Sequence, residues 1–183
     1  MVESSIAGGV IPEQLEALQK LKAAEESRVV EQALAAAQQH LRMDAAYITT
    51  IDSRQQTVEA IVGDPDAEAR YQGLVLPIEQ TFCVRMLSGE VPNAIPDTRA
   101  VPLTSDLGMS KELQAYIGVP VRLSDGRVHG SFCCVSRQVR PDLGADEVRF
   151  MQVLADIVAA RLEQVQGNIA RLTERFRARR QTA

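Results

Sequence analysis

Two apolar segments joined by a tight turn constrain the fold of this chain more than any other feature. Residues 117–123 and 128–136 are almost continuously apolar, and Asp125-Gly126 lies between them. An Asp-Gly pair between two such runs is a strong β-hairpin signal. Apolar runs without polar alternation are typical of strands that are covered on both faces. The sequence therefore predicts a central hairpin in a sheet with structure packed against each face.

The remaining elements are shorter strands between two long helices. Strands are predicted over 46–51, 57–62, 74–76 and 91–95, and a short helix over 79–89. Residues 96–111 contain two prolines and a glycine and are expected to be irregular. The expected organisation is a flexible tail over 1–11, an N-terminal helix over 12–42, a domain core over 43–163 and a C-terminal signalling helix extension over 164–183.

Composition narrows the class of protein. A chain of 183 residues fits one domain with a sizeable core. Its net charge of -4, with 4% aromatic residues and no Trp, disfavours a nucleic-acid binder. No apolar run approaches the roughly 20 residues of a spanning helix, so no membrane partner is expected. Three Cys without a disulfide-scaffold spacing fit reduced thiols in the cytoplasm.

The last helix, predicted to run from about residue 145 to about residue 180, carries an apolar stripe in two halves. Met151, Leu154 and Val158 form the first half, and a four-residue step then shifts the stripe around the helix. The first half is expected to pack on the sheet, and the second to form a homodimer interface with other helices. That predicted interface consists of Leu162, Val165, Ile169, Leu172 and Phe176. The alternative is an ordinary terminal helix that folds back on its own domain.

The cysteines and histidines do not form a recognisable catalytic or metal motif. Neighbouring residues of a strand point to opposite faces, so Cys133 and Cys134 do not suit one metal ion, and no metal site is predicted. Cys83 is either a reactive thiol in the first turn of the 79–89 helix or a core residue. His129, at the start of a strand, is a weak candidate for the axial ligand of a haem. No catalytic residue is assigned.

An ordered set of motifs resembles the GAF domains that lie ahead of EAL-type cyclic-di-GMP phosphodiesterases in bacterial signalling proteins. The resemblance covers about residues 25 to 163. The motifs that carry it are Glu79-Gln80-Thr81-Phe82-Cys83, Ile95-Pro96-Asp97-Thr98-Arg99, Ile117-Gly118-Val119-Pro120-Val121, Leu123-Ser124-Asp125-Gly126 and Gly130-Ser131-Phe132-Cys133-Cys134.

The resemblance implies an α+β, PAS-related fold: an antiparallel sheet of five or six strands, with the terminal helices on one face and a ligand pocket on the other. Mapped onto this chain, the pocket walls are the 79–89 helix, the 96–113 segment and the paired strands 117–123 and 128–136. Position in the motifs makes seven residues candidates either for ligand binding or for packing. They are Phe82, Cys83, Asp97, Arg99, Tyr116, Ser131 and Cys133.

The same resemblance implies that the chain is a non-enzymatic sensor, expected to bind an unidentified small molecule. The signal is expected to pass through a helical dimer to a downstream output domain, with cyclic-di-GMP turnover as one such output. Residues 106–112 lack the Cys of bilin-binding relatives, so no covalent bilin is expected. One alternative is a dimerisation scaffold with an empty pocket. Another is a thiol-based methionine sulfoxide reductase, although Cys83-Val84 lacks the Asp that typically follows one of the cysteines of such enzymes.

Overall fold

The structure is a computed structural model that describes residues 12–105, 107 and 111–181. The tail expected over 1–11 lies outside the described residues. In chain order the elements are α1 (Pro12–Leu41), β1 (Ala45–Ile51), β2 (Gln55–Gly63), α2 (Pro65–Tyr71), β3 (Val75–Pro77), η1 (Ile78–Gln80), α3 (Phe82–Leu87), β4 (Ala94–Ile95), α4 (Pro102–Ser105), β5 (Ala115–Arg122), β6 (Val128–Ser136) and α5 (Ala145–Gln181).

The six strands form one antiparallel sheet in the order β3-β2-β1-β6-β5-β4, which confirms the predicted α+β fold class. The predicted hairpin is β5–β6, and it places β6 in the middle of the sheet between β5 and β1. Its turn requires a glycine, because Gly126 has a φ of +85°, in the left-handed region. The hairpin therefore supplies the central strands on which both faces are built.

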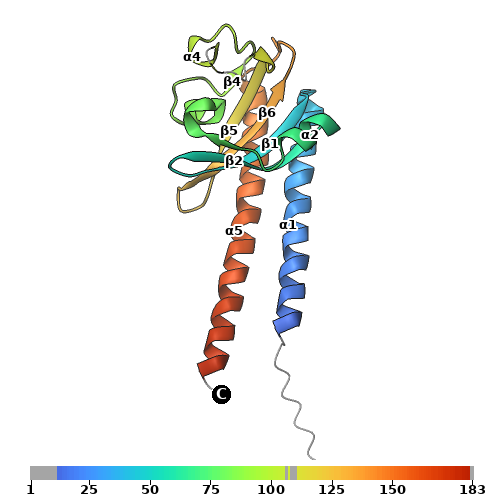
Figure 1. The fold of residues 1–183 in the computed structure, drawn as a ribbon, viewed down its shortest axis with the longest axis vertical. Helices are drawn as coiled ribbons and strands as arrows, with labels where there is room; N and C mark the ends of the chain where they lie inside the picture. The colour runs from blue at the N-terminus through green and yellow to red at the C-terminus, as the bar shows by residue number, and fades with distance from the viewer. Residues whose placement is uncertain (1–11, 106, 108–110, 182–183) are drawn as a thin grey trace, which may run out of the picture.

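Each face of the sheet carries its own core. Helices α1 and α5 cover one face, and α2, α3 and α4 lie over the other (Figure 1). Because side chains alternate along a strand, Cys134 belongs to the helix-covered core with Met151, and Cys133 belongs to the opposite core with Tyr116. The predicted placement of the two thiols on opposite faces is confirmed.

A β-bulge changes which residues of β2 face the second core. In the β1–β2 ladder Ile48 pairs with Ala60, but the next residue of β1 pairs with Val58, so Glu59 is the extra residue. As a result Gln56, Val58 and Ile61 all reach the same face, although a regular strand would send Ile61 to the other one.

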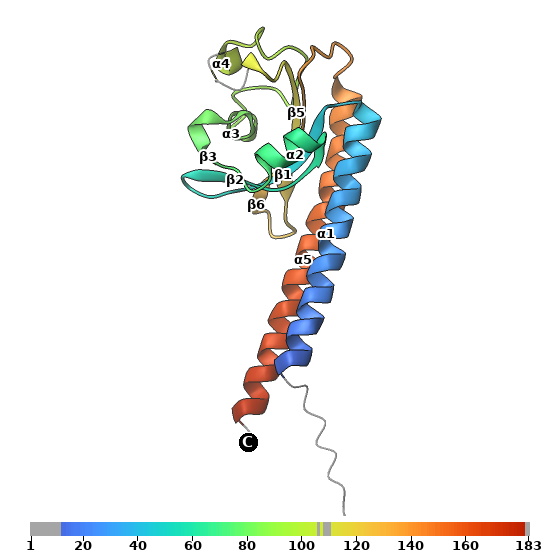
Figure 2. The same cartoon turned by 45° about the vertical axis from the view of Figure 1, so that its right-hand side comes forward.

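The two long helices lie side by side and extend beyond the sheet (Figures 1 and 2). Leu162 and Val165, two residues of the predicted dimer interface, are buried within the single chain. The other three members of that interface have side chains outside the described part of the structure: Ile169, Leu172 and Phe176. Val153 and Ile157 of α5 are 58% and 50% exposed. Among the described helices, none is both long and apolar enough to cross a membrane.

Candidate functional site

Four of the seven predicted ligand-binding residues meet in the core between the sheet and α3. The rings of Phe82 and Tyr116 contact each other in a tilted arrangement, with centroids 5.3 Å apart and planes at 50°. The sulfurs of Cys83 and Cys133 are 3.5 Å apart, and the Tyr116 hydroxyl lies 3.2 Å from the Cys133 sulfur. All four side chains are at most 1% exposed. The Tyr47 hydroxyl lies 3.7 Å from the Cys83 sulfur and completes what we call the thiol–phenol cluster.

Ser131, the fifth predicted residue of this group, lies beside the cluster and is also fully buried. Its hydroxyl is 2.7 Å from that of Thr49 on β1, so two buried polar groups satisfy each other. Asp97 and Arg99 are not brought to the cluster. They pair with each other at the surface, where Arg99 Nε donates to Asp97 Oδ1 at 3.0 Å and holds the pKa of that carboxyl below its usual value.

Local structure explains why the cluster forms. The side chain of Thr81 caps α3 by accepting a hydrogen bond from the Val84 N–H, and this starts the helix that carries Cys83 into the core. On β5, Gly118 leaves room for the Tyr116 hydroxyl, because a Cβ at that position would overlap this hydroxyl and contact the Cys133 sulfur. The glycine and the tyrosine are therefore one packing unit.

The cluster shifts the pKa values of its two thiols in opposite directions. Burial raises the pKa of the Cys83 thiol, but the polar groups of the cluster, above all the Cys133 thiol 3.5 Å away, outweigh burial and lower that pKa to about 6. Burial, together with the Cys83 thiolate beside it, raises the pKa of Cys133. Burial likewise raises the pKa of the Tyr116 hydroxyl, which therefore stays protonated at neutral pH. The arrangement favours one thiolate held by several donors.

This distribution predicts a pH dependence. The pKa of about 6 lies below the value of about 8.5 for an unfolded thiol, so ionisation of Cys83 favours folding. Its stabilising contribution is complete above the unfolded pKa and is lost as the pH falls through about 6. We expect the free energy of unfolding in urea to rise between these two values, and thiolate absorbance to titrate near the lower one.

A matched pair of variants assigns this titration. Cys83→Ala is expected to remove it. Cys134→Ala is expected to keep it, because burial raises the pKa of Cys134 and its thiol does not ionise in this range. A native thiol titration that survives Cys83→Ala would contradict the assignment.

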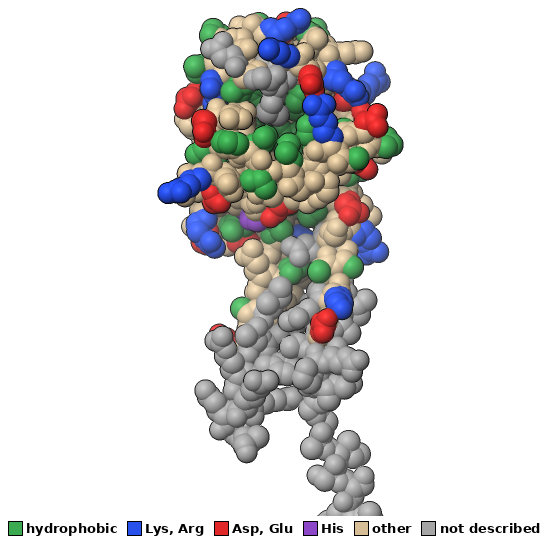
Figure 3. All heavy atoms as spheres, in the orientation of Figure 1, with side chains coloured by type: hydrophobic (Ala, Val, Ile, Leu, Met, Phe, Trp, Pro, Cys, Tyr) green, Lys and Arg blue, Asp and Glu red, His purple; other side chains and the backbone are tan. Residues whose placement is uncertain are grey.

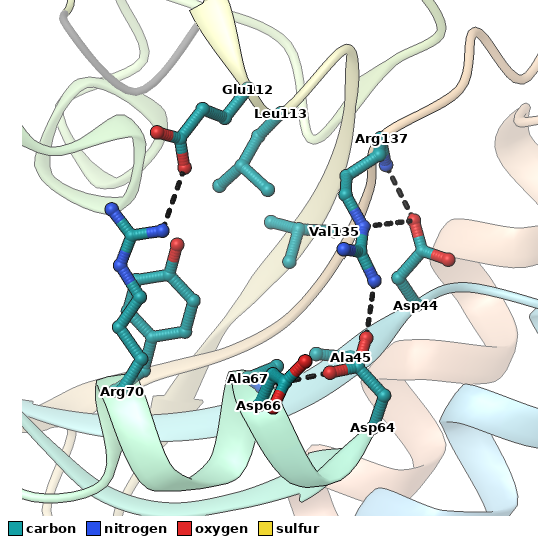
Figure 4. A pocket seen from close by; sticks show the side chains of 11 residues that line it. Asp44, Ala45, Asp64, Asp66, Ala67, Arg70, Glu112, Leu113, Val135 and Arg137 are labelled. Carbon is teal, nitrogen blue, oxygen red and sulfur yellow. Dashed lines mark hydrogen bonds and ion pairs between the residues drawn. The ribbon is translucent and has the colours of Figure 1, made fainter.

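A charged hollow opens on the same side of the sheet as the cluster, between α2, β6 and the segment before β5 (Figure 4). Its volume is about 90 Å³. Arg137 lies between two carboxylates: its backbone N–H donates to Asp44 Oδ2 at 2.5 Å, and its guanidinium pairs with Asp64. Across the hollow, Arg70 Nη1 lies 3.2 Å from Glu112 Oε2. The charged side chains of the lining are Asp44, Asp64, Asp66, Arg70, Glu112 and Arg137.

A narrower apolar cavity of about 30 Å³ adjoins the hollow. The two share one wall, formed by Ala45, Tyr71, Leu113 and Val135. The rest of the cavity is lined by Tyr47, Gln56, Val58, Ile61, Leu74 and Leu76. Gln56 is 3% exposed, and its Oε1 is buried without a hydrogen-bond partner among the residues that the structure describes. On the face that Figure 3 shows, hydrophobic side chains lie in the middle of the part of the molecule that contains the sheet, with acidic and basic side chains around them.

Sequence reasoning missed Gln56 and the acids of the hollow. The β2 segment alternates imperfectly, and its bulge hides the fact that Gln56 shares a face with Ile61. The signal that could have identified Gln56 is a polar residue at a position where the pairing of β1 with β2 turns the side chain toward the core. Tyr47 connects the apolar cavity with the thiol–phenol cluster, because it lines the cavity and also contacts Cys83 of the cluster.

The structure shows no grouping suited to a metal ion. Within residues 12–105, 107 and 111–181, no three His, Cys, Asp or Glu side chains converge on one point. His129, the weak haem candidate, lies with its Nε2 3.2 Å from Glu59 Oε2 on β2.

A single antiparallel sheet with long terminal helices on one face and a hollow on the other places the chain in a class of α+β domains. The GAF domain family model matches residues 25–162, most of the chain, and the chain therefore belongs to the GAF domain family.

Individual relatives agree with this assignment. The chain is 24% identical over 142 residues to a cyclic di-GMP phosphodiesterase of Pseudomonas aeruginosa; the match covers 76% of the chain but only 23% of that protein. Among solved structures, it resembles the blue-light absorbing form of the Thermosynechococcus elongatus PixJ GAF domain, with a TM-score of 0.64 and 16% identity over 84% of this chain and 95% of the other. It also resembles the GAF-B domain of Mycobacterium smegmatis DevS, with a TM-score of 0.60 and 14% identity over 79% of this chain and 98% of the other. These two likenesses concern the fold.

Proposed function

We propose that this GAF domain is a non-enzymatic sensor that binds a small molecule in the hollow and the adjoining apolar cavity. The observation that carries the proposal is the Oε1 of Gln56, which is buried in the wall of that cavity and has no partner within residues 12–105, 107 and 111–181. Buried polar atoms are nearly always hydrogen-bonded, so an orphaned acceptor beside an opening is a good candidate for a ligand contact.

The thiol–phenol cluster is proposed to support this site from behind rather than to catalyse a reaction. A thiol enzyme needs an accessible nucleophile, whereas Cys83 and Cys133 are at most 1% exposed. Of the cluster residues, Tyr47 alone lines the cavity. A ligand in the cavity would contact Tyr47, and through Tyr47 it would affect the positions of Cys83 and α3.

The signal is proposed to pass through the sheet to the terminal helices. The cavity involves β1, β2 and β6, and the turn of the β5–β6 hairpin holds α5 directly: the Ser124 N–H and hydroxyl donate to Glu163 Oε1 at 2.8 and 2.6 Å. Such a mechanism requires the ligand to have unequal affinity for two arrangements of these elements.

We further propose a homodimer formed through the terminal helices, which would pass the change to an output domain. The relative from Pseudomonas aeruginosa, a cyclic di-GMP phosphodiesterase, supports cyclic-di-GMP turnover as that output. The buried Leu162 and Val165 already hold α5 against its own chain, whereas Val153 and Ile157 leave apolar surface on the same helix.

Native mass spectrometry of gently purified protein tests the sensor proposal. A reproducible additional mass, displaced on exchange into ligand-free buffer, is the expected result. The proposal would be contradicted if the protein never carries such a mass and if its backbone amide NMR signals are unchanged by extracts of small molecules. That result would favour a scaffold with an empty cavity.

The dimer can be tested separately with an exposed residue. Ile157→Glu places a charge on the apolar surface of α5 and is expected to convert a dimer into a monomer in sedimentation velocity. Its matched control is Leu103→Glu, since Leu103 is 44% exposed on α4, away from the long helices. A wild-type chain that sediments as a monomer at high concentration, or a dimer unaffected by Ile157→Glu, would contradict this interface.

A further inference from the structure

We infer that the ligand is a small amine with an apolar body: a hydrogen-bond donor on that body reaches Gln56 Oε1, and its positively charged end lies in the acidic hollow. This inference rests on the proposed function and specifies the chemistry of the molecule that is sensed. Three features of the described residues carry it: the orphaned acceptor, the size and apolar lining of the cavity, and the charge balance of the hollow.

The buried Oε1 of Gln56 needs a hydrogen-bond donor, and a water molecule is poorly suited to provide it. A buried water molecule needs two to four polar partners. The cavity around Gln56 is lined mainly by aliphatic and aromatic side chains, such as Val58, Leu74 and Leu76, and the Tyr47 hydroxyl is already engaged with Cys83. A ligand whose N–H or O–H is attached to an apolar group would satisfy Gln56 and fill the apolar space at once.

The dimensions limit the size of this ligand. The cavity and the hollow have volumes of about 30 and about 90 Å³ and share a wall. For comparison, an apolar cavity of roughly 150 Å³ in another protein accommodates benzene. The two compartments together are smaller than that cavity, so only the apolar body of a small molecule is enclosed, and its charged end extends into the open mouth of the hollow. A nucleotide or a tetrapyrrole would require the walls to move apart.

The charge balance of the hollow favours a cation. Four carboxylates line it, from Asp44, Asp64, Asp66 and Glu112, against two guanidinium groups. Arg137 is held between Asp44 and Asp64, and Arg70 pairs with Glu112, so neither arginine is free to take an anionic ligand without giving up an acid (Figure 4).

The backbone of α2 does not provide an anion site either. The carboxylate of Asp64 caps this helix by accepting the Ala67 N–H at 2.8 Å. The same carboxylate has a lowered pKa, chiefly because of this backbone hydrogen bond, and therefore stays negative at neutral pH. The hollow thus presents a net negative charge toward the apolar cavity.

Three related probes separate the two predicted contacts, using the full chain and isothermal titration calorimetry. Tyramine has a phenol donor and an ammonium group, phenethylamine lacks the donor, and 4-hydroxyphenylacetate replaces the cation with an anion. We expect tyramine to bind, phenethylamine to bind up to about tenfold more weakly because one hydrogen bond is missing, and 4-hydroxyphenylacetate to bind more weakly still.

Matched variants test whether tyramine binds at this site. Gln56→Met removes the acceptor at similar length and is expected to reduce tyramine affinity to that of phenethylamine, while Gln55→Met, at the exposed neighbouring residue, leaves it unchanged. Asp64→Asn keeps the helix cap but removes a charge, and is expected to weaken both amines. Asp52→Asn is the control, because Asp52 also accepts backbone N–H groups but lies in an exposed turn away from the hollow.

The outcomes distinguish this inference from the function on which it rests. No detectable binding of tyramine, or binding that Gln56→Met leaves unchanged, would overturn the amine assignment. Preferred binding of 4-hydroxyphenylacetate would also overturn it, but would leave the sensor proposal standing with an anionic ligand. Whether the chain is a sensor at all is decided independently by the native mass spectrum.

Discussion

Gly118→Ala is expected to lower the free energy of unfolding by about 3 kcal/mol, the upper part of the usual range for overpacking a well-filled core. The added methyl group would overlap the Tyr116 hydroxyl and contact the Cys133 sulfur. Neither neighbour can easily move, since both are 0% exposed. For a chain of this size the change corresponds to a fall in melting temperature of roughly 6–12 °C, measurable by calorimetry or by urea unfolding.

Gly167→Ala is the matched control for this change. Gly167 lies inside α5, and an added Cβ would meet nothing within 4 Å. Alanine is favoured over glycine in a helix interior by about 1 kcal/mol, so this variant should be slightly more stable than the wild type. If Gly118→Ala were as stable as the wild type, the Tyr116 hydroxyl would have to lie elsewhere, and the thiol–phenol cluster described above would be wrong.

Periodicity explains why so much of the fold could be predicted from the sequence. The almost continuous apolar runs at 117–123 and 128–136, with Asp125-Gly126 between them, have few alternatives to a buried hairpin. The three- and four-residue spacing of apolar side chains similarly indicates long helices, and α5 runs over Ala145–Gln181. These signals are local, so no knowledge of the tertiary structure is needed to read them.

The site depends on contacts between distant segments, which local patterns do not contain. Sequence motifs suggested Asp97 and Arg99 as ligand contacts, but two opposite charges two residues apart satisfy each other at the surface. Cys83, Cys133 and Tyr116 lie together in the structure, yet their complete burial arises only when α3 packs on β5 and β6. The bulge at Glu59 removed the two-residue alternation from which an inward-facing Gln56 could have been recognised.

Gln56→Met should have opposite effects on stability and on binding. In the unliganded chain the buried Oε1 of Gln56 has no hydrogen-bond partner in the described part of the structure, and leaving such an acceptor unsatisfied costs about 1–3 kcal/mol. Methionine has a similar length, is apolar and adapts to irregular cavities, so the variant should be more stable than the wild type by about 1–2 kcal/mol. The expected rise in melting temperature is roughly 2–8 °C.

The same substitution removes the acceptor that the proposed ligand needs, so the more stable protein should be the weaker binder. This combination separates a functional residue from a structural one, because residues retained for a ligand commonly reduce the stability of the free protein. Thr57→Val provides the control: Thr57 is the next residue of β2 and only partly buried, so its replacement should change neither quantity much. If Gln56→Met destabilised the unliganded chain, the amide would have a structural partner, and the cavity would lose the main reason for its assignment as a binding site.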